Sequence, residues 1–400
     1  MREYIPDAYR EKKIEKLWTS LFPRLCAVSF PISIAASNLS ILCVGFTLWI
    51  YKSIKTKRIL FLYDELILPV ILFILAGVVS CLFSYDPVST LKHMKSAWLF
   101  LIYFAIINLM HKKDVKTTLY ILLITTAFVA IVSIVEHFTY IRIFGYTIVK
   151  HFPRSQGFFN ISLTYAGQLM QILLLLISFF FIYRKKRLAV GSIIILSIIA
   201  FLFTLSRGPW LGFLFGLLVF FIFYNKRLIP AYVAFLLLLV FFSYLFLPSV
   251  FERGRTLLAG TADSSIKQHL YLWKTALLMF SHHPLFGVGA GNFKHYALPL
   301  TKDLSFLQCH SSAHNIFLHT LATRGIIGFF AFVFLWYSIL KSLLKRMHSP
   351  KDNLGYALNV GVFSAFCALL FAGLFETNFN DSEVIMMSWL LLGISRVSNT

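Results

Sequence analysis

Long apolar stretches alternate with short polar loops along the whole chain, and every second polar loop is basic. Of the 400 residues, 58% are apolar, and a helix that is apolar on all sides has to be buried or surrounded by lipid. Lysine and arginine concentrate in the cytoplasmic loops of membrane proteins. The alternation therefore predicts an all-α integral membrane protein whose basic loops face the cytoplasm. These loops are Arg10–Lys16, Lys52–Arg58, Lys112–Lys116, Arg184–Arg187, Lys226–Arg227 and Lys341–Lys351.

The apolar stretches suffice for about twelve transmembrane helices, because one span needs about 20 mostly apolar residues. An even number places both termini in the cytoplasm. No linker divides the chain, so residues 1–400 are expected to form one multi-pass membrane domain. Only Ala35–Asn38 separates the first two spans. The expected spans are 18–34, 37–52, 66–84, 94–110, 117–136, 161–183, 188–205, 208–224, 229–247, 315–340, 355–375 and 382–397.

Membrane topology explains the net charge of +21. Most of the basic residues lie in the predicted cytoplasmic loops, where they orient the helices and contact anionic lipid headgroups. We therefore expect membrane lipids as partners and no nucleic acid. The five cysteines show no CxxC pair and no zinc-ligand spacing, so they do not indicate a metal site.

One long outer loop, residues 248–313, lies between the ninth and tenth spans, and a long loop of this kind is where function concentrates. Within it, Ser265–His283 is predicted to form an amphipathic helix that ends before Pro284. A flexible turn with three glycines, Gly287, Gly289 and Gly291, follows. The expected apolar face of the helix consists of Ile266, Leu270, Trp273, Leu277 and Phe280.

Arg207 is the sharpest candidate on the predicted outer face. It lies in a tight Ser-Arg-Gly-Pro break between two long apolar spans, where a cation is costly unless it faces a cavity or an anion. One interpretation is that the side chain extends to the membrane interface. The other is a phosphate site, because a guanidinium forks onto two phosphate oxygens. Arg154, which precedes Gly157 in an earlier outer loop, has the same two interpretations.

A second candidate cluster lies where the long loop enters the tenth span. His310 and His314 are four residues apart, so on a helix they would share a face. A metal site is disfavoured because no carboxylate lies between them and no third ligand is evident. The remaining interpretations are a polar helix start capped by Ser311 or Ser312, and a histidine that acts as a base near neutral pH.

The outer face has no paired carboxylates of the glycosidase kind and no acidic DxD-like pair for a metal-bound nucleotide sugar. An enzyme with this outer face would use a histidine base and arginine clamps, with no metal and no cofactor. Its substrate would then need a leaving group that is already anionic, such as a pyrophosphate.

Several short motifs follow one another in a characteristic order, and they resemble the O-antigen ligase and polymerase superfamily. Twelve spans and one large periplasmic loop between spans nine and ten fit the same superfamily. The resemblance covers nearly the whole chain. The motifs are Ser84-x-Asp86-Pro87, Arg154-x-x-Gly157, Ser206-Arg207-Gly208, Trp273 followed by Pro284-Leu285-Phe286-Gly287-Val288-Gly289 and Phe293, and His314-Asn315 followed by Leu318, Leu321, Gly325 and Gly328.

This resemblance implies a substrate pair and a location. Members of the superfamily transfer a glycan from undecaprenyl pyrophosphate to a hydroxyl group on the periplasmic side of the bacterial inner membrane. In the ligases, the acceptor is the lipid A–core oligosaccharide. The resemblance places the catalytic base on His314, in the His-Asn motif with Asn315, and the donor-phosphate arginine on Arg207.

One departure from the family pattern concerns the second phosphate contact. The family usually has an arginine a few residues before the loop-helix tryptophan, and here that position is His269. Either His269 replaces the arginine, or Arg253 or Arg255 does so from earlier in the loop. The expected substrate-binding residues are therefore Arg154, Arg255, His269, His310 and Asn315.

The leading hypothesis is a metal-independent, inverting glycosyltransferase of the O-antigen ligase type. A repeat-unit polymerase of the same superfamily, whose acceptor is a second lipid-linked glycan, is the closest alternative. A transporter of lipid-linked glycans without chemistry is the alternative from another class. Transporters carry broken helices with charges near the membrane midplane, whereas the unusual polar residues here cluster at the outer surface.

Overall fold

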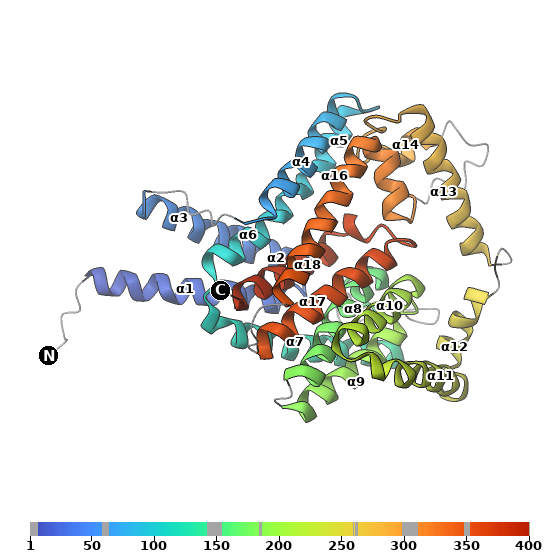
Figure 1. The fold of residues 1–400 in the computed structure, drawn as a ribbon, viewed down its shortest axis with the longest axis horizontal. Coiled ribbons are helices and arrows are strands. Elements are labelled where there is room, and N and C mark those ends of the chain that lie inside the picture. The colour runs from blue at the N-terminus through green and yellow to red at the C-terminus, as the bar shows by residue number, and fades with distance from the viewer. Residues whose placement is uncertain are drawn as a thin grey trace.

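The computed structural model describes residues 7–57, 64–141, 154–183, 186–258, 260, 263–297, 311–347 and 353–399, and these residues are predominantly helical (Figure 1). The first half contains α1 (Asp7–Ser29), α2 (Ile34–Leu39), α3 (Thr47–Lys55), α4 (Ile67–Leu82), α5 (Pro87–Met94), α6 (Phe100–Leu109), α7 (Val115–Thr139), α8 (Ser162–Ser178) and α9 (Arg187–Phe203). The second half contains α10 (Arg207–Tyr224), α11 (Ile229–Phe246), α12 (Pro248–Arg255), α13 (Ser264–His282), α14 (Phe293–Ala297), α16 (Ile316–Met347), α17 (Asn353–Ala372) and α18 (Ser382–Ser398).

The helical membrane class predicted from the sequence is confirmed. Within the described residues, seven helices are long and apolar enough to cross a membrane: 34–55, 112–139, 162–182, 207–224, 226–246, 316–347 and 354–372. Two shorter apolar helices, 67–82 and 187–203, coincide with further predicted spans. The other three predicted spans coincide with α1, α6 and α18, so the number twelve remains a prediction.

The boundary between the first two predicted spans is wrong. Residues 35–38 are helical, within α2, and the chain instead breaks between α1 and α2. Pro31 lies in that break. Proline has no backbone N–H to donate and its ring clashes with the preceding turn, so the helix ends there.

Small residues allow the central helices to pack closely. α8 lies in the interior, with 83% of its most apolar window buried, and α10 and α17 pack against it. A Cβ atom at Gly212 would lie 2.7 Å from the carbonyl oxygen of Ala368, and one at Gly216 would lie 2.9 Å from that of Ser364. Glycines spaced by four therefore bring α10 against the backbone of α17, as small residues commonly do between membrane helices.

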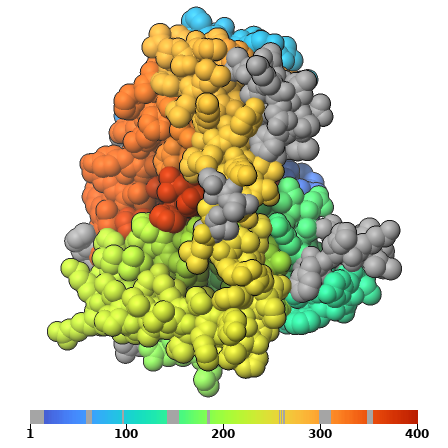
Figure 2. Space-filling model, turned by 90° about the vertical axis from the view of Figure 1, so that its right-hand side faces the viewer, coloured from blue at the N-terminus to red at the C-terminus, as the bar shows by residue number. Residues whose placement is uncertain are grey.

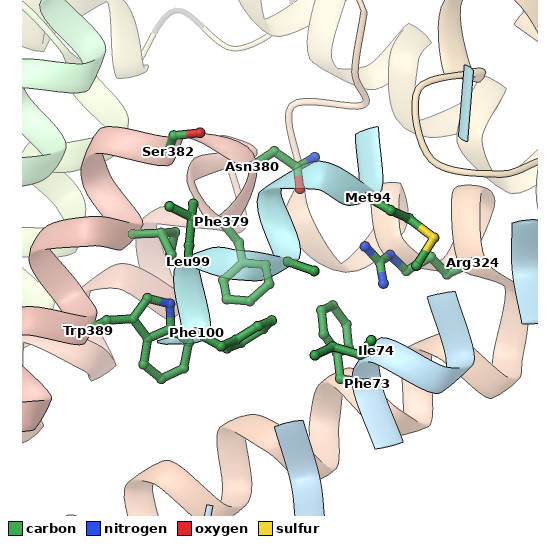
Figure 3. A pocket seen from close by; sticks show the side chains of 12 residues that line it. Phe73, Ile74, Met94, Leu99, Phe100, Arg324, Phe379, Asn380, Ser382 and Trp389 are labelled. Carbon is green, nitrogen blue, oxygen red and sulfur yellow. The ribbon is translucent and has the colours of Figure 1, made fainter. Parts of the chain in front are cut away.

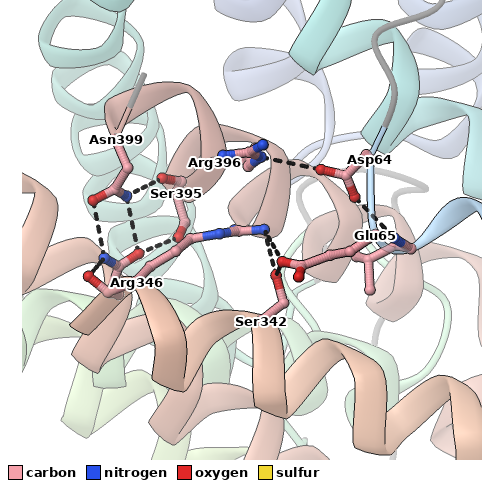
Figure 4. Close-up of polar contacts among 9 residues, drawn as sticks. Asp64, Glu65, Ser342, Arg346, Ser395, Arg396 and Asn399 are labelled. Atoms are coloured by element: carbon pink, nitrogen blue, oxygen red, sulfur yellow. Dashed lines mark hydrogen bonds and ion pairs between the residues drawn. The ribbon is translucent and has the colours of Figure 1, made fainter. Parts of the chain in front are cut away.

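A polar cluster holds the C-terminal end of α16 in place, far from its first residue, Ile316 (Figure 4). Arg396 of α18 donates from Nε to the buried Asp64, at 3.0 Å. Ser342 and Arg346 of α16 both contact the carboxylate of Glu65. These contacts tie the start of α4 to α16 and α18 and leave the other ends of these helices to form the site.

The long loop crosses one face of the molecule as a helical strap, α12 to α14 (Figures 1 and 2). The predicted helix is confirmed to within one residue as α13, with Asp263 as its N-cap and an end just before Pro284. Part of its expected apolar face is exposed. Leu272, Ala276 and Met279 are buried, whereas Leu270 and Leu277 are about half exposed.

The segment after α13 pairs with a break in α16. Val288 and Gly289 donate their N–H groups to the carbonyls of Ala322 and Thr323, at 3.0 and 2.9 Å, and Ile326 donates to Pro284 at 2.8 Å. The break occurs at Gly325, with φ 63° and ψ −169°, a conformation that is essentially restricted to glycine. The Pro-Leu-Phe-Gly-Val-Gly motif therefore anchors the strap onto the helix that begins just after His314.

Candidate active site

The centre of the site is a contact between His314 and Glu376. Nδ1 of His314 lies 3.1 Å from Oε2 of Glu376. A carboxylate only accepts hydrogen bonds, so Nδ1 carries the proton that is donated. His314 itself has a φ of 45°, a left-handed conformation that is costly for a residue with a side chain and is often found at functional sites.

Asn315 holds His314 in this position. Its side-chain oxygen accepts from the N–H groups of Phe317 and Leu318, both at 3.0 Å, and its amide donates to the carbonyl of Leu374 at 3.0 Å. Asn315 is therefore the N-cap of α16. Through its bond to Leu374, it also ties the start of α16 to the segment that leads into Glu376. The expectation of Ser311 or Ser312 as the cap is wrong, because α16 begins only at Ile316. His314 precedes the helix, so the argument that it shares a helical face with His310 also fails.

Arg207 lies on the other side of Glu376. It is the first residue of α10, after a turn in which Leu205 has a φ of 51°. Its guanidinium donates to the hydroxyl of Thr256 at 2.8 Å and lies 3.4 Å from both carboxylate oxygens of Asp263. A Cβ atom at Gly208 would lie 2.9 Å from Cγ of Glu376, so the glycine of the Ser-Arg-Gly motif leaves room for this carboxylate.

The basic side chains of the site line a cavity of about 460 Å³. Arg154, Arg207, Arg253 and His269 line it together with Glu376. Partial burial, followed by the nearby charges of Arg207 and Arg154, lowers the pKa of Arg253 below its ordinary value. Three guanidinium groups that repel one another in this way favour an anionic ligand between them.

Asp263 is the counter-ion of Arg207. Burial opposes its ionisation, but the hydrogen bonds from Arg207 and from the Ile266 N–H outweigh that effect and hold the pKa of Asp263 below its ordinary value. Because Asp263 also caps α13, the strap helix begins at the arginine cavity.

The structure brings together four of the predicted site residues. Arg154, Arg207 and His269 line one cavity, and the rings of His269 and His314 are 5.3 Å apart. Arg255 does not line this cavity. It is exposed and pairs with Glu252 at 2.7 Å, while Arg253 occupies the position beside Arg207. His310 lies outside the described residues.

A second cavity, of about 450 Å³, is lined by both His314 and Glu376. His93, His319 and Arg324 line it, as do residues from the start of α18. Glu376 lines both cavities. Among the described residues, no group of three or more His, Cys, Asp or Glu side chains is placed to hold a metal ion.

The sequence analysis did not assign Glu376, Asp263 or Arg253 to the site. Glu376 and Asp263 are among the few carboxylates of the predicted outer face, which is the only signal that could have selected them. Arg253 was considered only as an alternative to His269.

Comparison with known families gives one match. Residues 192–333 match the family model described as O-antigen ligase. This part of the chain is similar to the O-antigen ligase family. The matched residues include Arg207, Arg253, His269 and His314, while Arg154 and Glu376 lie outside them. The resemblance found from the motifs is thus confirmed. No match was found among curated proteins.

Proposed function

We propose that this protein is a glycosyltransferase of the O-antigen ligase type, which transfers a glycan from undecaprenyl pyrophosphate to a hydroxyl group of lipid A–core. The observation that carries the proposal is that Glu376, the partner of His314, lines two cavities, one of them also lined by three arginines. A base whose partner lines two cavities suits a reaction that joins two substrates. The arginine cavity suits an anionic leaving group.

The arginine cavity would bind the donor pyrophosphate. Arg207 and Arg253 are held at its wall by Thr256 and by the carbonyl of Leu205, which accepts from Nε of Arg253 at 3.2 Å. Pre-positioned guanidinium groups stabilise the negative charge that builds on the pyrophosphate as its bond to the sugar breaks. Arg154 and His269 complete the wall.

An apolar groove of about 370 Å³ lies beside this cavity, and Leu211 of α10 lines both. Its walls are apolar side chains of α9, α10, α11 and α12. Such a groove suits the isoprenoid chain of a lipid-linked donor, with the pyrophosphate held among the arginines.

The proton transfer follows from the tautomer of His314. Nε2 accepts the proton of the acceptor hydroxyl while Nδ1–H remains bonded to Glu376, which stabilises the imidazolium that forms. The acceptor oxygen attacks the anomeric carbon of the donor sugar, the carbon–oxygen bond to the pyrophosphate breaks, and its electron pair leaves with undecaprenyl pyrophosphate. Direct attack without an enzyme nucleophile inverts the anomeric configuration.

The test is transfer by the purified protein from a defined lipid-linked glycan, with EDTA present, to either of two acceptors. Transfer to lipid A–core supports the ligase. Transfer only to a second lipid-linked glycan would instead identify a repeat-unit polymerase. Donor binding without any product would identify a transporter, and activity that requires added zinc or magnesium would contradict the mechanism.

A further inference from the structure

Arg324 is a cation inside a helix that is long and apolar enough to span the membrane, α16. The ion pairs found among the described residues do not include Arg324. Its guanidinium lies over the ring of Phe73, 4.4 Å from the centroid. Figure 3 shows the guanidinium near Phe73 and Met94. A charged side chain in such a segment is costly and marks a functional site by default.

Arg324 lines the cavity of about 450 Å³ that His314 also lines, and its side chain is only partly buried. It also lines a small neighbouring cavity of about 40 Å³, whose wall includes Phe379 and Asn380. The larger cavity, of about 450 Å³, is roomy enough for part of a glycan.

His319 gives an independent indication that this cavity takes a ligand. It is 8% exposed, and its Nδ1 has no hydrogen-bond partner among the described residues. Leaving a buried polar atom unpaired is unfavourable. His93 and Arg324 line the same cavity as His319, so the groups around it are cationic or able to become cationic.

The two carboxylates that line the same cavity are already engaged. Glu376 accepts from His314. Asp381 accepts from the hydroxyl of Thr164 at 2.5 Å and from the N–H of Val384 at 3.2 Å, as the N-cap of α18. Among the described residues, Arg324 is therefore left with an aromatic ring as its contact, in a cavity that favours a negative charge.

We propose that Arg324, with His319 beside it, is an anion-binding subsite for the acceptor, so that the preferred acceptor carries a phosphate group in addition to the hydroxyl that reacts. This inference rests on the proposed function. Arg324 lies eight residues after Ile316, the first residue of α16, which corresponds to roughly 12 Å along the helix. The phosphate is thus bound away from the reacting hydroxyl and apart from the donor pyrophosphate.

The first experiment compares two acceptors with the full-length protein in nanodiscs. One is lipid A–core with its phosphates, and the other is the same preparation after phosphatase treatment. The wild-type protein should favour the phosphorylated acceptor in kcat/KM. Arg324→Gln should reduce that ratio roughly tenfold to hundredfold, the worth of a hydrogen bond to a charged group. Arg324→Lys should keep part of the preference, and Arg227→Gln, in an exposed loop, should keep all of it. An unchanged ratio in Arg324→Gln would overturn the proposal.

The second experiment separates this inference from the proposed function. Inorganic phosphate should raise the thermal unfolding midpoint of Arg207→Ala, in which the donor cavity is weakened, but not that of the Arg207→Ala/Arg324→Gln double variant. If phosphate shifts the midpoint only where Arg324 is present, but the wild-type protein transfers glycan to no acceptor, the subsite is retained and the glycosyltransferase is rejected. Transfer combined with equal midpoint shifts in the two variants would reject the subsite alone. Arg324→Lys, measured in the same background, should regain part of the shift if Arg324→Gln unfolds too easily to be compared.

Discussion

His314 and Glu376 are 62 residues apart in the sequence, and their side chains meet at 3.1 Å between Nδ1 and Oε2. In the proposed mechanism, the carboxylate orients the ring so that Nε2 accepts the proton of the acceptor hydroxyl. Because Glu376 also lines the arginine cavity, it joins the proposed base to the proposed donor site.

Replacing Glu376 by glutamine should lower kcat while leaving the KM for the lipid-linked donor nearly unchanged. General-base catalysis supplies roughly 10²–10⁴ in rate, and losing the carboxylate that orients the base should remove part of it, about tenfold to hundredfold. Steady-state kinetics of Glu376→Gln and Glu376→Asp check this, and the aspartate should restore part of kcat. A higher KM for the donor with an unchanged kcat would instead assign Glu376 to the donor site.

Arg253 and Arg255 form a matched pair for testing the second phosphate contact. Arg253 lines the arginine cavity, whereas Arg255 pairs with Glu252 on the surface. Arg253→Gln should therefore weaken donor binding more than Arg255→Gln, by roughly tenfold if one charged hydrogen bond is lost. Donor affinity measured for both variants decides between them, and a larger effect at Arg255 would favour the sequence-based expectation.

Gly325→Ala should destabilise the protein strongly. The residue has a φ of 63°, and a Cβ atom there would lie 2.3 Å from the carbonyl oxygen of Leu285, so either α16 or the Pro284–Gly289 segment must move. Gly254→Ala is the control, because a Cβ atom there meets nothing within 4 Å. Thermal unfolding in detergent should show a midpoint several degrees lower for Gly325→Ala and near wild type for Gly254→Ala. Equal midpoints would contradict the close approach.

The alternating basic loops predict that Lys186 and Lys345 face the cytoplasm and that Lys267 and His310 face the periplasm. Single cysteines at these positions, in a cysteine-free background, can be labelled in intact cells with a membrane-impermeant reagent. Lys267→Cys should react and Lys186→Cys should not. Labelling of both from the same side would disprove the topology and the periplasmic site.

The sequence predicted those parts of the site that depend on local chemistry. A cation in a tight Ser-Arg-Gly break and a histidine at a helix entrance are unusual within a membrane segment, so Arg207 and His314 stood out. The loop helix was also predictable, because its apolar period, the following proline and the three glycines agree.

Other features depend on contacts that no local pattern records. Glu376 was one of several outer carboxylates until the fold placed it beside His314. Part of the apolar stripe of α13 is exposed, because the buried side of this helix is set by its contacts with α14 and α16, which an apolar pattern does not record. The break between α1 and α2 lies at Pro31 and not at the more polar Ala35–Asn38, because proline has no backbone N–H to donate and its ring clashes with the preceding turn.

The central claim is that His314 is the base and Arg207 a donor contact. The measurement is transfer rate and donor affinity, made side by side on His314→Ala, Arg207→Ala and Arg207→Lys in nanodiscs. His314→Ala should lose transfer by roughly 10²–10⁴ and bind the lipid pyrophosphate normally. Arg207→Ala should lose both transfer and donor binding. Arg207→Lys should restore little of either, because lysine cannot reproduce the planar fork of the guanidinium. A folded His314→Ala protein that transfers glycan at a near-normal rate would contradict the account.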